Sequence, residues 1–552
     1  MKSSVLAGAV VALATAAPAQ AIPADFKAKA DALLKKSFPA TGPGAAVIVT
    51  DEGKIAYEAG QGLADLKAKT PITPNTVFRM GSITKQFSAA IMLQLVSEGK
   101  VSLDDKLSQF LPDYPSPGAD ATVAQLLNHT VGVQSYTDIP GWMVEANTSN
   151  AYTTEQMIAQ FKDLPSPSRP GEKWAYNNSG YVLVGAVIEK VTGKPWYVNV
   201  DERIAKPLGL RTIRYGVLES QTPHMARGYT DKGGTIAEAQ AIHMSVPHAA
   251  GALIGSVEDL AKWNAALRHG KVVPPELYAR MNMPTQLPDG TSEKYGFGMG
   301  MREVRGREAL GHGGGIFGFS TDSIYLPEDD VFVAVFTNSD SPKTSPGMVT
   351  QQLAALAIDD PYPTFQKVAL DAPSIEPWVG LYKVKDGERR IFLKDGKLIT
   401  QRTGGGELEA FAAGNGKYFY EGSLTWFELK RDAAGTPVVV MYQQGAVTPE
   451  LSPRAGPIPA QLPAVDVPRA VLQSYAGLYD TPAGKLTVAL PDEGPMTVML
   501  AGQQPIAVAA VNQTEFRLIG VDARIAFQSE GGKVTGATIK QGGRELPAKR
   551  AD

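Results

Sequence analysis

A serine and a lysine three residues apart, Ser82 and Lys85, have the types and spacing for joint chemistry. From Phe87 onward apolar residues recur every three or four positions, which predicts a helix, and Gly81 places Ser82 in its first turn. Positions three apart share a helix face, so the lysine ammonium can lie against the serine hydroxyl. The free N–H groups and the dipole of a first turn add partial positive charge. This field favours a serine alkoxide and should lower the pKa of Lys85, as an activated nucleophile requires.

The same spacing occurs again at Ser97 and Lys100. The predicted helix ends there at Gly99, so no free N–H groups face that serine, and the pattern is typical of a C-cap and turn. For Ser82 the simpler interpretation is an N-cap that accepts one backbone N–H. Short motifs often match by chance. A catalytic role for Ser82 therefore depends on partners elsewhere in the chain.

Two later stretches supply candidate partners. Tyr176 and Asn178 lie on a turn just before a predicted helix. A phenol near a lysine ammonium loses its proton more easily, so Tyr176 could accept the Ser82 proton and pass it to a leaving group. Asn178 could orient Lys85 or a substrate carbonyl. His312 precedes glycines that let a substrate backbone approach, and we place it on an edge strand. The simpler interpretations are a capped turn and an ordinary strand histidine.

These three motifs, in this order, resemble the serine β-lactamase-related family. That family includes class C β-lactamases, low-molecular-weight penicillin-binding DD-peptidases, related esterases and D-aminopeptidases. The resemblance covers about residues 45 to 340. Its motifs and their surrounding segments are Ser82-x-x-Lys85, Leu126 to Gly132, Pro170 to Tyr181 with Tyr176-x-Asn178, Pro207 to Leu210, and His312-x-Gly314.

The resemblance implies a mechanism in which Ser82 attacks a carbonyl, forms an acyl-enzyme and is released by water. It implies that Lys85 and Tyr176 manage the proton, and it leaves open which of them is the base. It also implies that His312 belongs to the catalytic set. The implied oxyanion hole consists of the backbone N–H groups of Ser82 and Gly315. The residues then expected to contact substrate are Gly313, Gly314 and Tyr136.

The third motif departs from the lactamase pattern. Class C enzymes carry Lys-Thr-Gly there, whereas Gly313 has no hydroxyl with which to bind a substrate carboxylate. His-Gly-Gly is instead similar to the D-aminopeptidase version. The sequence therefore predicts an exported serine peptidase or amidase that cleaves short peptides, including D-residue-containing or nonribosomal ones. The alternatives are a promiscuous carboxylesterase, a DD-peptidase or weak β-lactamase, and a non-catalytic penicillin-binding-like protein.

The elements that must position these residues form an α+β domain. A hairpin at 45–60 comes first and helices follow, among them a short helix that ends at Gly132, with an irregular segment at 133–170 after it. Strands at 295–301, 307–315, 319–326 and 331–337 and a helix at 347–357 come last. This order predicts an antiparallel sheet assembled from both ends of the segment 22–360, flanked by helices and an all-helical subdomain.

The rest of the chain is predicted to form two small antiparallel β-barrels of lipocalin-like type. Short alternating strands follow residue 360, and Gly-Leu-Tyr recurs at 380–382 and 477–479. We place the barrels at 373–445 and 469–552, joined by a Pro-rich linker at 446–468. In D-aminopeptidase-like architecture a loop such as 491–495 would reach the cleft and limit substrate size.

Composition and charge limit the partners, the location and the cofactors that we expect for this chain. The 552-residue chain carries a formal net charge of -3, which argues against nucleic acid as a partner. Residues 1–21 have a basic start, a short apolar run and an Ala-x-Ala end, which predicts a signal peptide cleaved after Ala21 and a periplasmic or secreted protein without a stable membrane anchor. With no cysteine and scattered histidines, neither a metal site nor a cofactor is predicted. The expected partner is a small peptide or ester substrate, and the oligomeric state stays open.

Overall fold

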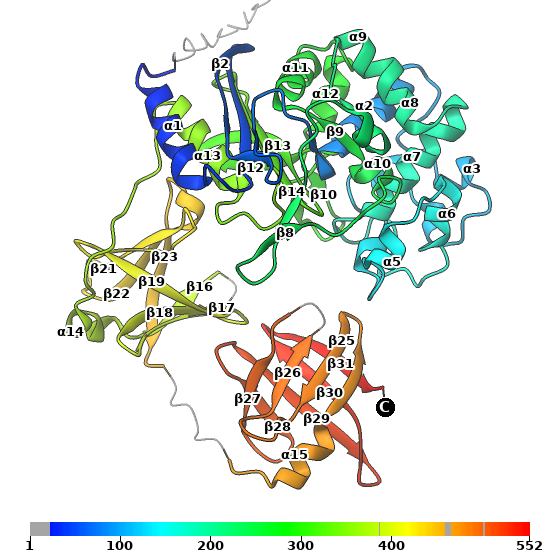
Figure 1. Cartoon of the computed structure of the whole chain (residues 1–552). Helices are drawn as coiled ribbons and strands as arrows, with labels where there is room; N and C mark the ends of the chain where they lie inside the picture. Colours follow the sequence, from blue (N-terminus) through cyan, green and yellow to red (C-terminus); the bar gives the residue numbers. More distant parts are fainter. Residues whose placement is uncertain (1–21, 386, 459–464, 501–502, 552) are drawn as a thin grey trace, which may run out of the picture.

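The computed structural model describes residues 22–385, 387–458, 465–500 and 503–551 (Figure 1). The expected signal peptide at 1–21 lies outside the described residues. The chain forms an N-terminal α+β domain followed by two closed barrels of antiparallel strands (Figure 1). Among the helices that the structure describes, none has both the length and the apolar character needed to cross a bilayer.

A six-stranded antiparallel sheet forms the centre of the N-terminal domain, in the order β12-β13-β14-β15-β1-β2. The first strand pairs with the last, with Ala45 opposite Thr337, so both ends of the domain sequence meet in one sheet, as predicted. The central strands are apolar on both faces because helices cover both. The strands are β1 (Ala45–Asp51), β2 (Lys54–Gln61), β12 (Gly300–Val304), β13 (Arg307–Ile316), β14 (Phe319–Leu326) and β15 (Val331–Thr337).

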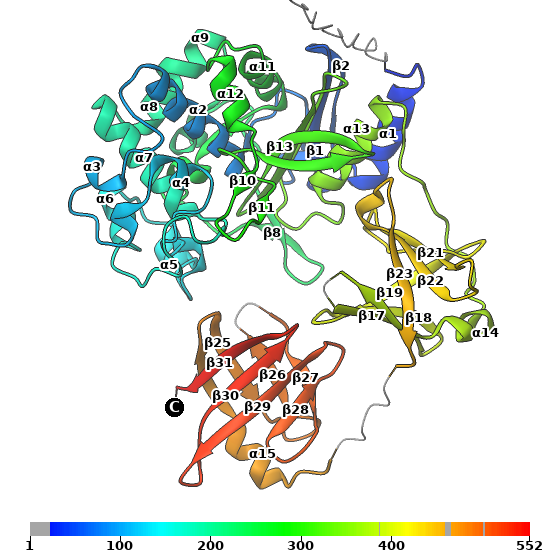
Figure 2. The same cartoon turned by 180° about the vertical axis from the view of Figure 1, so that it is seen from behind.

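Different parts of the sequence cover the two faces of this sheet. The first and last helices of the domain, α1 (Phe26–Ser37) and α13 (Pro346–Ala357), pack on one face. The helical part of the domain covers the other (Figure 2). Its main helices are α2 (Thr84–Ser97), α4 (Val123–Leu127), α6 (Thr154–Ala159), α7 (Asn178–Thr192), α8 (Trp196–Val200), α10 (His248–Gly251), α11 (Val257–Arg268) and α12 (Pro275–Met281).

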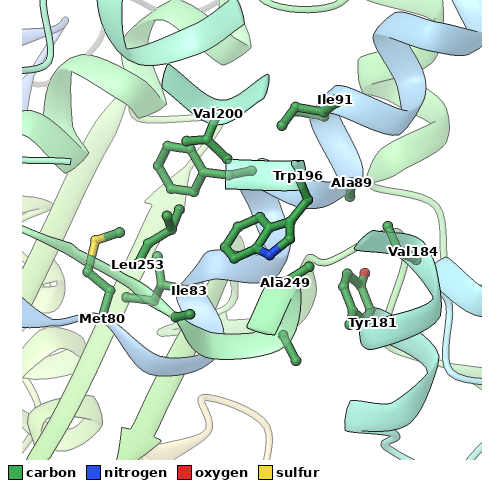
Figure 3. Close-up of a cluster of buried hydrophobic side chains, with 14 of the residues drawn as sticks. Met80, Ile83, Ala89, Ile91, Tyr181, Val184, Trp196, Val200, Ala249 and Leu253 are labelled. Atoms are coloured by element: carbon green, nitrogen blue, oxygen red, sulfur yellow. The ribbon is translucent and has the colours of Figure 1, made fainter. Parts of the chain in front are cut away.

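Helix α2 lies at the centre of this helical part and is buried along nearly its whole length. A helix that is apolar on every side belongs in a core. Side chains of α2 such as Ile91 pack with Val184 of α7, Trp196 of α8 and Ala249 of α10 in one cluster (Figure 3). Helix α2, which carries Lys85 and directly follows the turn with Ser82, is therefore packed on several sides.

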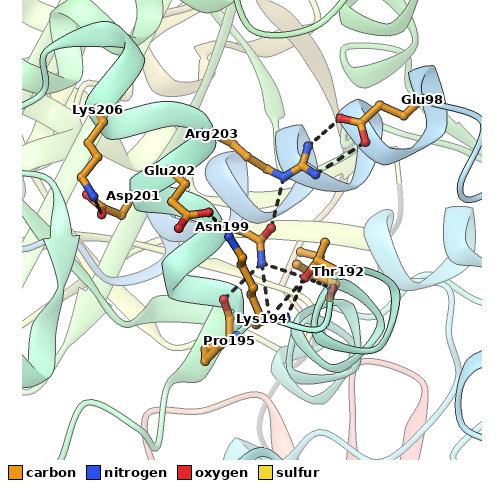
Figure 4. Close-up of polar contacts among 10 residues, drawn as sticks. Glu98, Thr192, Lys194, Pro195, Asn199, Asp201, Glu202, Arg203 and Lys206 are labelled. Carbon is orange, nitrogen blue, oxygen red and sulfur yellow. Dashed lines mark hydrogen bonds and ion pairs between the residues drawn. The ribbon is translucent and has the colours of Figure 1, made fainter.

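The far end of α2 is fastened by polar contacts (Figure 4). Arg203 of the π-helical turn η4 (Asp201–Ala205) donates to Glu98 at 2.6 Å and to the Asn199 side-chain oxygen at 3.1 Å. Asn199 in turn donates to Thr192 at the end of α7, at 2.9 Å. The ends of α2 and α7 are thereby joined, which fixes the relative position of the two helices that carry candidate site residues.

Several predicted elements differ from those observed. Ser82 lies in a 3₁₀ turn, η1 (Gly81–Ile83), and α2 begins only at Thr84. The short helix expected to end at Gly132 ends at Leu127, because His129 has a positive φ of 66°. The segment 133–170, expected to be irregular, contains short helices: η3 (Tyr136–Asp138), α5 (Glu145–Thr148) and α6.

Two eight-stranded closed barrels follow, as the repeated Gly-Leu-Tyr predicts. The expected linker at 446–468 contains β23, which closes the first barrel, so that barrel extends to Gly456 and the boundary at 445 is wrong. Pro453 lies within β23 and made this stretch resemble a linker. The barrel strands are β16 (Gly380–Val384), β17 (Gly387–Lys394), β18 (Lys397–Arg402), β19 (Glu407–Gly414), β20 (Lys417–Phe419), β21 (Trp426–Arg431), β22 (Pro437–Tyr442) and β23 (Glu450–Gly456), then β24 (Gly477–Thr481), β25 (Gly484–Ala489), β26 (Thr497–Leu500), β27 (Ile506–Ala510), β28 (Glu515–Leu518), β29 (Ala523–Glu530), β30 (Lys533–Gln541) and β31 (Arg544–Arg550).

The loop 491–495 does not lie where the resemblance places it. Arg469, at the start of α15 (Arg469–Tyr475), donates to the Pro491 carbonyl at 2.7 Å. In both views α15 lies at the end of the second barrel that points away from the N-terminal domain (Figures 1 and 2). The expected role of this loop at the cleft is therefore wrong for this arrangement of the chain.

Candidate active site

Ser82 stands on a sharp turn between strand β5 (Phe78–Arg79) and helix α2. The turn depends on Gly81, which has a φ of 54°. A side chain there would also come within 3.0 Å of the Gly315 backbone nitrogen on strand β13. The absence of a side chain at Gly81 therefore brings Ser82 close to β13, the strand that carries the third sequence motif.

Lys85 is completely buried beneath Ser82, and its amine has three polar neighbours. Nζ donates to Asn178 Oδ1 at 2.8 Å and to the Ala250 carbonyl at 2.9 Å. The third neighbour, Ser82 Oγ, lies farther away at 3.2 Å. A neutral amine has two N–H bonds and one lone pair, which matches two short contacts to obligate acceptors and one longer contact to a hydroxyl.

Burial lowers the pKa of Lys85 well below its ordinary value. A lowered pKa was predicted from the sequence, and its direction is confirmed. The cause differs, because removal of the amine from water is the main effect and the helix dipole was the expected one. Lys85 is thereby prepared to be neutral and basic at a pH where an exposed lysine is charged.

Asn178 opens helix α7 and points its carbonyl oxygen at Lys85. Its amide nitrogen donates to Thr137 Oγ1 at 3.1 Å, which fixes the orientation of the amide. Asn177, the N-cap of α7, accepts from the Gly180 N–H and donates to the Val133 carbonyl at 2.6 Å. The helix start that aims Asn178 is thus stabilised on both sides.

The Tyr176 phenol lies near the Ser82 hydroxyl. The Lys85 amine sits 4.7 Å from the centre of the phenol ring. Burial raises the pKa of Tyr176, and the nearby Ser82 hydroxyl only partly offsets this. The prediction that this phenol loses its proton readily is wrong for the free protein, because burial favours the protonated form. Tyr176 is therefore a protonated donor beside the nucleophile.

His312 lies behind Tyr176, with the two ring centres 6.1 Å apart. Its Nδ1 contacts the Gly313 carbonyl at 2.5 Å, so Nδ1 carries the proton and Nε2 accepts from the Tyr295 hydroxyl at 2.8 Å. Burial lowers the pKa of His312 to about 3. Both nitrogens of this neutral ring are engaged within the protein, and the described contacts do not join His312 to Ser82. Its position is that of a support for Tyr176.

Strand β13 passes next to the Ser82 turn and leaves part of its edge free. It is second in the sheet and not the edge strand that the sequence analysis expected. However, β12 pairs with β13 only as far as Gly311, so 312–316 has no strand partner on that side within the described residues. A free edge of this kind can bind an extended substrate through its backbone.

The glycines of this edge have different surroundings. A side chain at Gly314 would lie 2.0 Å from the Met80 carbonyl, whereas one at Gly315 would meet nothing within 4 Å. Gly314 therefore permits the close packing of β13 on the Ser82 turn, and Gly315 faces open space. Its backbone N–H and that of Ser82 are the candidate oxyanion donors.

Replacing Gly314 with alanine is expected to lower stability and turnover, because the new methyl group forces β13 away from Met80 and Ser82. Overpacking of this kind costs about 1–3 kcal/mol. Gly315→Ala is the matched control on the same strand, since its methyl group finds room. Thermal unfolding of both variants measures the difference. An equal decrease in Tm for the two would contradict the steric argument.

A cavity of about 420 Å³ opens above Ser82. Tyr136, expected to contact substrate, and Gly315, expected to supply an oxyanion N–H, line it, whereas Gly313 and Gly314 are not among its lining residues. Most of the wall is apolar or neutral. The remaining lining residues are Gly81, Ser82, Thr137, Met143, Asn178, Ile242, Pro247, Ala250, Gly251, Ile316, Phe317, Phe319, Ser320 and Asp340.

Three residues with contacts in this region were missed as site residues by the sequence analysis. The Tyr295 hydroxyl hydrogen-bonds to His312. The His129 ring lies tilted against Tyr176, with ring centres 4.3 Å apart, and accepts from the Asn177 N–H at 3.0 Å. Asp340 lines the cavity. His129 lies in one of the segments that carry the family resemblance, which was a usable signal. The other two come from separate loops and no spacing connects them to Ser82.

Comparison with known proteins shows that the sequence has relatives. The model of the protein family described as Beta-lactamase matches residues 36–357. A D-aminopeptidase from Gluconobacter oxydans is 27% identical over 359 residues, which is 63% of this chain and 65% of that protein. The match thus spans less than two thirds of the relative's own length.

Solved structures share the fold. The octameric penicillin-binding protein homologue from Pyrococcus abyssi superposes with a TM-score of 0.55 at 24% identity, covering 77% of this chain and 99% of that one. The D-amino acid amidase from Ochrobactrum anthropi SV3, solved with D-phenylalanine, gives a TM-score of 0.54 at 24% identity and covers 61% of this chain and 99% of its own.

Proposed function

The chain belongs to the β-lactamase family, and from that membership we propose that it is a serine peptidase or amidase that cleaves short peptides through an acyl-enzyme on Ser82. The observation that carries the proposal is the environment of the Lys85 amine. The amine donates to Asn178 Oδ1 at 2.8 Å and to the Ala250 carbonyl at 2.9 Å. Ser82 Oγ lies 3.2 Å away, so the lone pair of a neutral amine is free to face it. This arrangement supports removal of the serine proton by a neutral lysine.

The reaction begins when the Lys85 lone pair accepts the Ser82 proton as Oγ attacks the substrate carbonyl carbon. The carbonyl oxygen becomes an oxyanion held by the N–H groups of Ser82 and Gly315. As the C–N bond breaks, the leaving nitrogen takes the Tyr176 proton, and Tyr176 is reprotonated from the Lys85 ammonium. The products of this half-reaction are the free amine and an ester on Ser82.

Water completes the cycle by the reverse proton route. It attacks the ester carbonyl, and its proton passes to the Lys85–Tyr176 pair as the second tetrahedral intermediate forms. When the C–O bond to Ser82 breaks, Oγ takes a proton back from that pair. The acid is released and the free enzyme is restored, with no group required beyond those of the chain and water.

The size and lining of the cavity favour substrates with small, partly apolar acyl groups. Its volume of about 420 Å³ is in the range of small-molecule sites, and Ile316 and Phe317 line one wall. Gly313 offers no hydroxyl for a substrate carboxylate, which disfavours penicillins and C-terminal D-Ala-D-Ala. The relative named D-aminopeptidase supports peptides or amides with a D-residue at the cleaved bond. Export to the periplasm or medium is part of the proposal and is supported by the pattern of residues 1–21 alone.

Steady-state kinetics on a panel of acyl donors tests this function. We expect higher kcat/KM for D-Ala-p-nitroanilide and short peptide amides than for nitrocefin, because the site lacks a carboxylate-binding hydroxyl. The L-Ala anilide reports the stereochemical preference, and p-nitrophenyl esters report the acyl chemistry itself.

Three results would overturn the proposed function. The highest kcat/KM for nitrocefin would favour a β-lactamase or DD-peptidase. Turnover of esters alone would favour a carboxylesterase. Binding of peptides without turnover of any donor would favour a silent penicillin-binding-like protein.

A further inference from the structure

Asp340 is the one charged residue among the described residues that line the cavity above Ser82. It follows the end of strand β15 and is half-buried. Its Oδ2 accepts from the Gly318 N–H at 2.7 Å, and its Oδ1 accepts from the Ser341 hydroxyl at 3.2 Å. An ionised carboxylate has about four acceptor positions, so two contacts leave capacity on the cavity side.

No cation neutralises this carboxylate within the part of the chain that the structure describes. Arg79 approaches the same turn and donates to the Phe317 carbonyl at 3.4 Å. However, its guanidinium is bound by both oxygens of Glu219, at 2.7 and 2.8 Å. The cavity therefore presents one net negative charge in a wall that is otherwise apolar or neutral.

The chain sets the distance between Asp340 and the reaction centre. Gly318, whose N–H Asp340 holds, is three residues beyond Gly315 on the same strand and turn. Three extended residues span at most about 10 Å. This limits the separation of Gly315 and Gly318, and a group bound by Asp340 lies in the same cavity as the carbonyl that reacts with Ser82.

We propose that Asp340 binds a cationic amino group on the acyl part of the substrate, and so selects acyl groups that carry a free amine near the scissile carbonyl. This inference rests on the proposed function, and it names the substrate class of that site. An ammonium donates to the open carboxylate positions, and such charge-assisted hydrogen bonds are about twice as strong as neutral ones. It would also neutralise a charge that the cavity wall itself leaves uncompensated.

The simpler role for Asp340 is to hold the β13–β14 turn. An asparagine side chain can do the same, because its carbonyl oxygen also accepts from the Gly318 N–H. Asp340→Asn therefore removes the charge and keeps the turn contact. The two roles predict different results for this variant, since only amine recognition requires the charge.

The experiment compares kcat/KM for matched pairs of substrates that differ only in the amine. Suitable pairs are D-Ala-p-nitroanilide and Gly-D-Ala-p-nitroanilide, each with its N-acetylated form, and p-nitrophenyl butyrate serves as an acyl donor without an amine. We expect the wild type to prefer the free amines. In Asp340→Asn, kcat/KM for the amines should fall by about 10- to 100-fold, as for loss of a hydrogen bond to a charged group. The acetylated and butyryl donors should be unaffected.

Asp231→Asn is the matched control. Asp231 also accepts from a backbone N–H of a turn, that of Gly234, but it is not among the residues lining the cavity. Asp231→Asn removes the same charge from a similar turn. An equal loss of kcat/KM for the free amines in this variant would mean that the effect comes from the overall charge of the protein, and it would overturn the inference. An unchanged amine preference in Asp340→Asn, or none in the wild type, would overturn it as well. If no donor reacts with the wild type, butyrate ester included, the proposed function fails and the inference fails with it.

Discussion

The Ser82→Ala variant is expected to lose turnover of every acyl donor, by about 10⁴- to 10⁶-fold in kcat, because removal of a catalytic nucleophile leaves only binding and oxyanion stabilisation. Ser82 Oγ lies 3.2 Å from the Lys85 amine and near the Tyr176 phenol. Intact-mass spectrometry provides a second readout. The wild type should gain the mass of one acyl or fluorophosphonate group, and the variant should gain none.

Ser97→Ala is the control for this prediction, since Ser97 and Lys100 repeat the same spacing. Ser97 is the exposed last residue of α2, and Lys100 forms an ion pair with Glu98 at 2.7 Å. Its substitution should change neither kcat nor labelling. Full labelling of Ser82→Ala would remove this serine from the mechanism, and loss of labelling in Ser97→Ala would show that the wrong copy of the motif was chosen.

The fold could be predicted where local pattern and tertiary packing agree. Strands β14 and β15 were predicted with the bounds that the structure shows, because uninterrupted apolar runs fit strands covered on both faces. The strand expected at 295–301 begins only at Gly300. Gly298, in this segment, allows the backbone to pass close to helix α2, since a side chain there would lie 2.7 Å from the Lys85 carbonyl. Periodicity detects alternation along one segment and cannot show which backbone lies against it.

The candidate site likewise contains residues that could be predicted from the sequence and one, Asp340, that could not. Ser82 and Lys85 are three residues apart, so helix geometry alone predicts their contact. Asn178 and Tyr176 were found through an ordered motif, and the structure brings both to the Lys85 amine. Asp340 lies on a loop after the last strand and reaches the cavity only because β15 pairs with β14. A contact of this kind depends on sheet register, which one sequence read locally does not reveal.

Lys85→Arg is expected to reduce kcat by about 10³-fold or more, because a guanidinium does not lose its proton in proteins and cannot act as the base. In the wild type, kcat/KM should rise with pH as Lys85 loses its proton, at a pH below the ordinary lysine value of about 10.4, since burial lowers its pKa. His312 should not contribute an inflection above pH 5, because burial lowers its pKa to about 3. The arginine variant should lack the rising limb.

The buried Lys85 amine should also make the free energy of unfolding depend on pH. The variant Lys85→Met tests this, because its side chain does not titrate. Between the lowered pKa of Lys85 and about 10.4, the unfolded chain binds one more proton than the folded one, so wild-type stability rises with pH in this window. The methionine variant lacks this contribution. Its stability relative to the wild type should therefore be highest near neutral pH and should decline as the pH approaches 10.

Urea unfolding at several pH values measures this difference. The exposed Lys100→Met is the control, and its difference from the wild type should stay constant. A constant difference for Lys85→Met as well would mean that Lys85 is charged in the folded protein throughout this range. In that case Lys85 could not be the base, and Tyr176 would have to take the Ser82 proton instead, against the burial that keeps its phenol protonated.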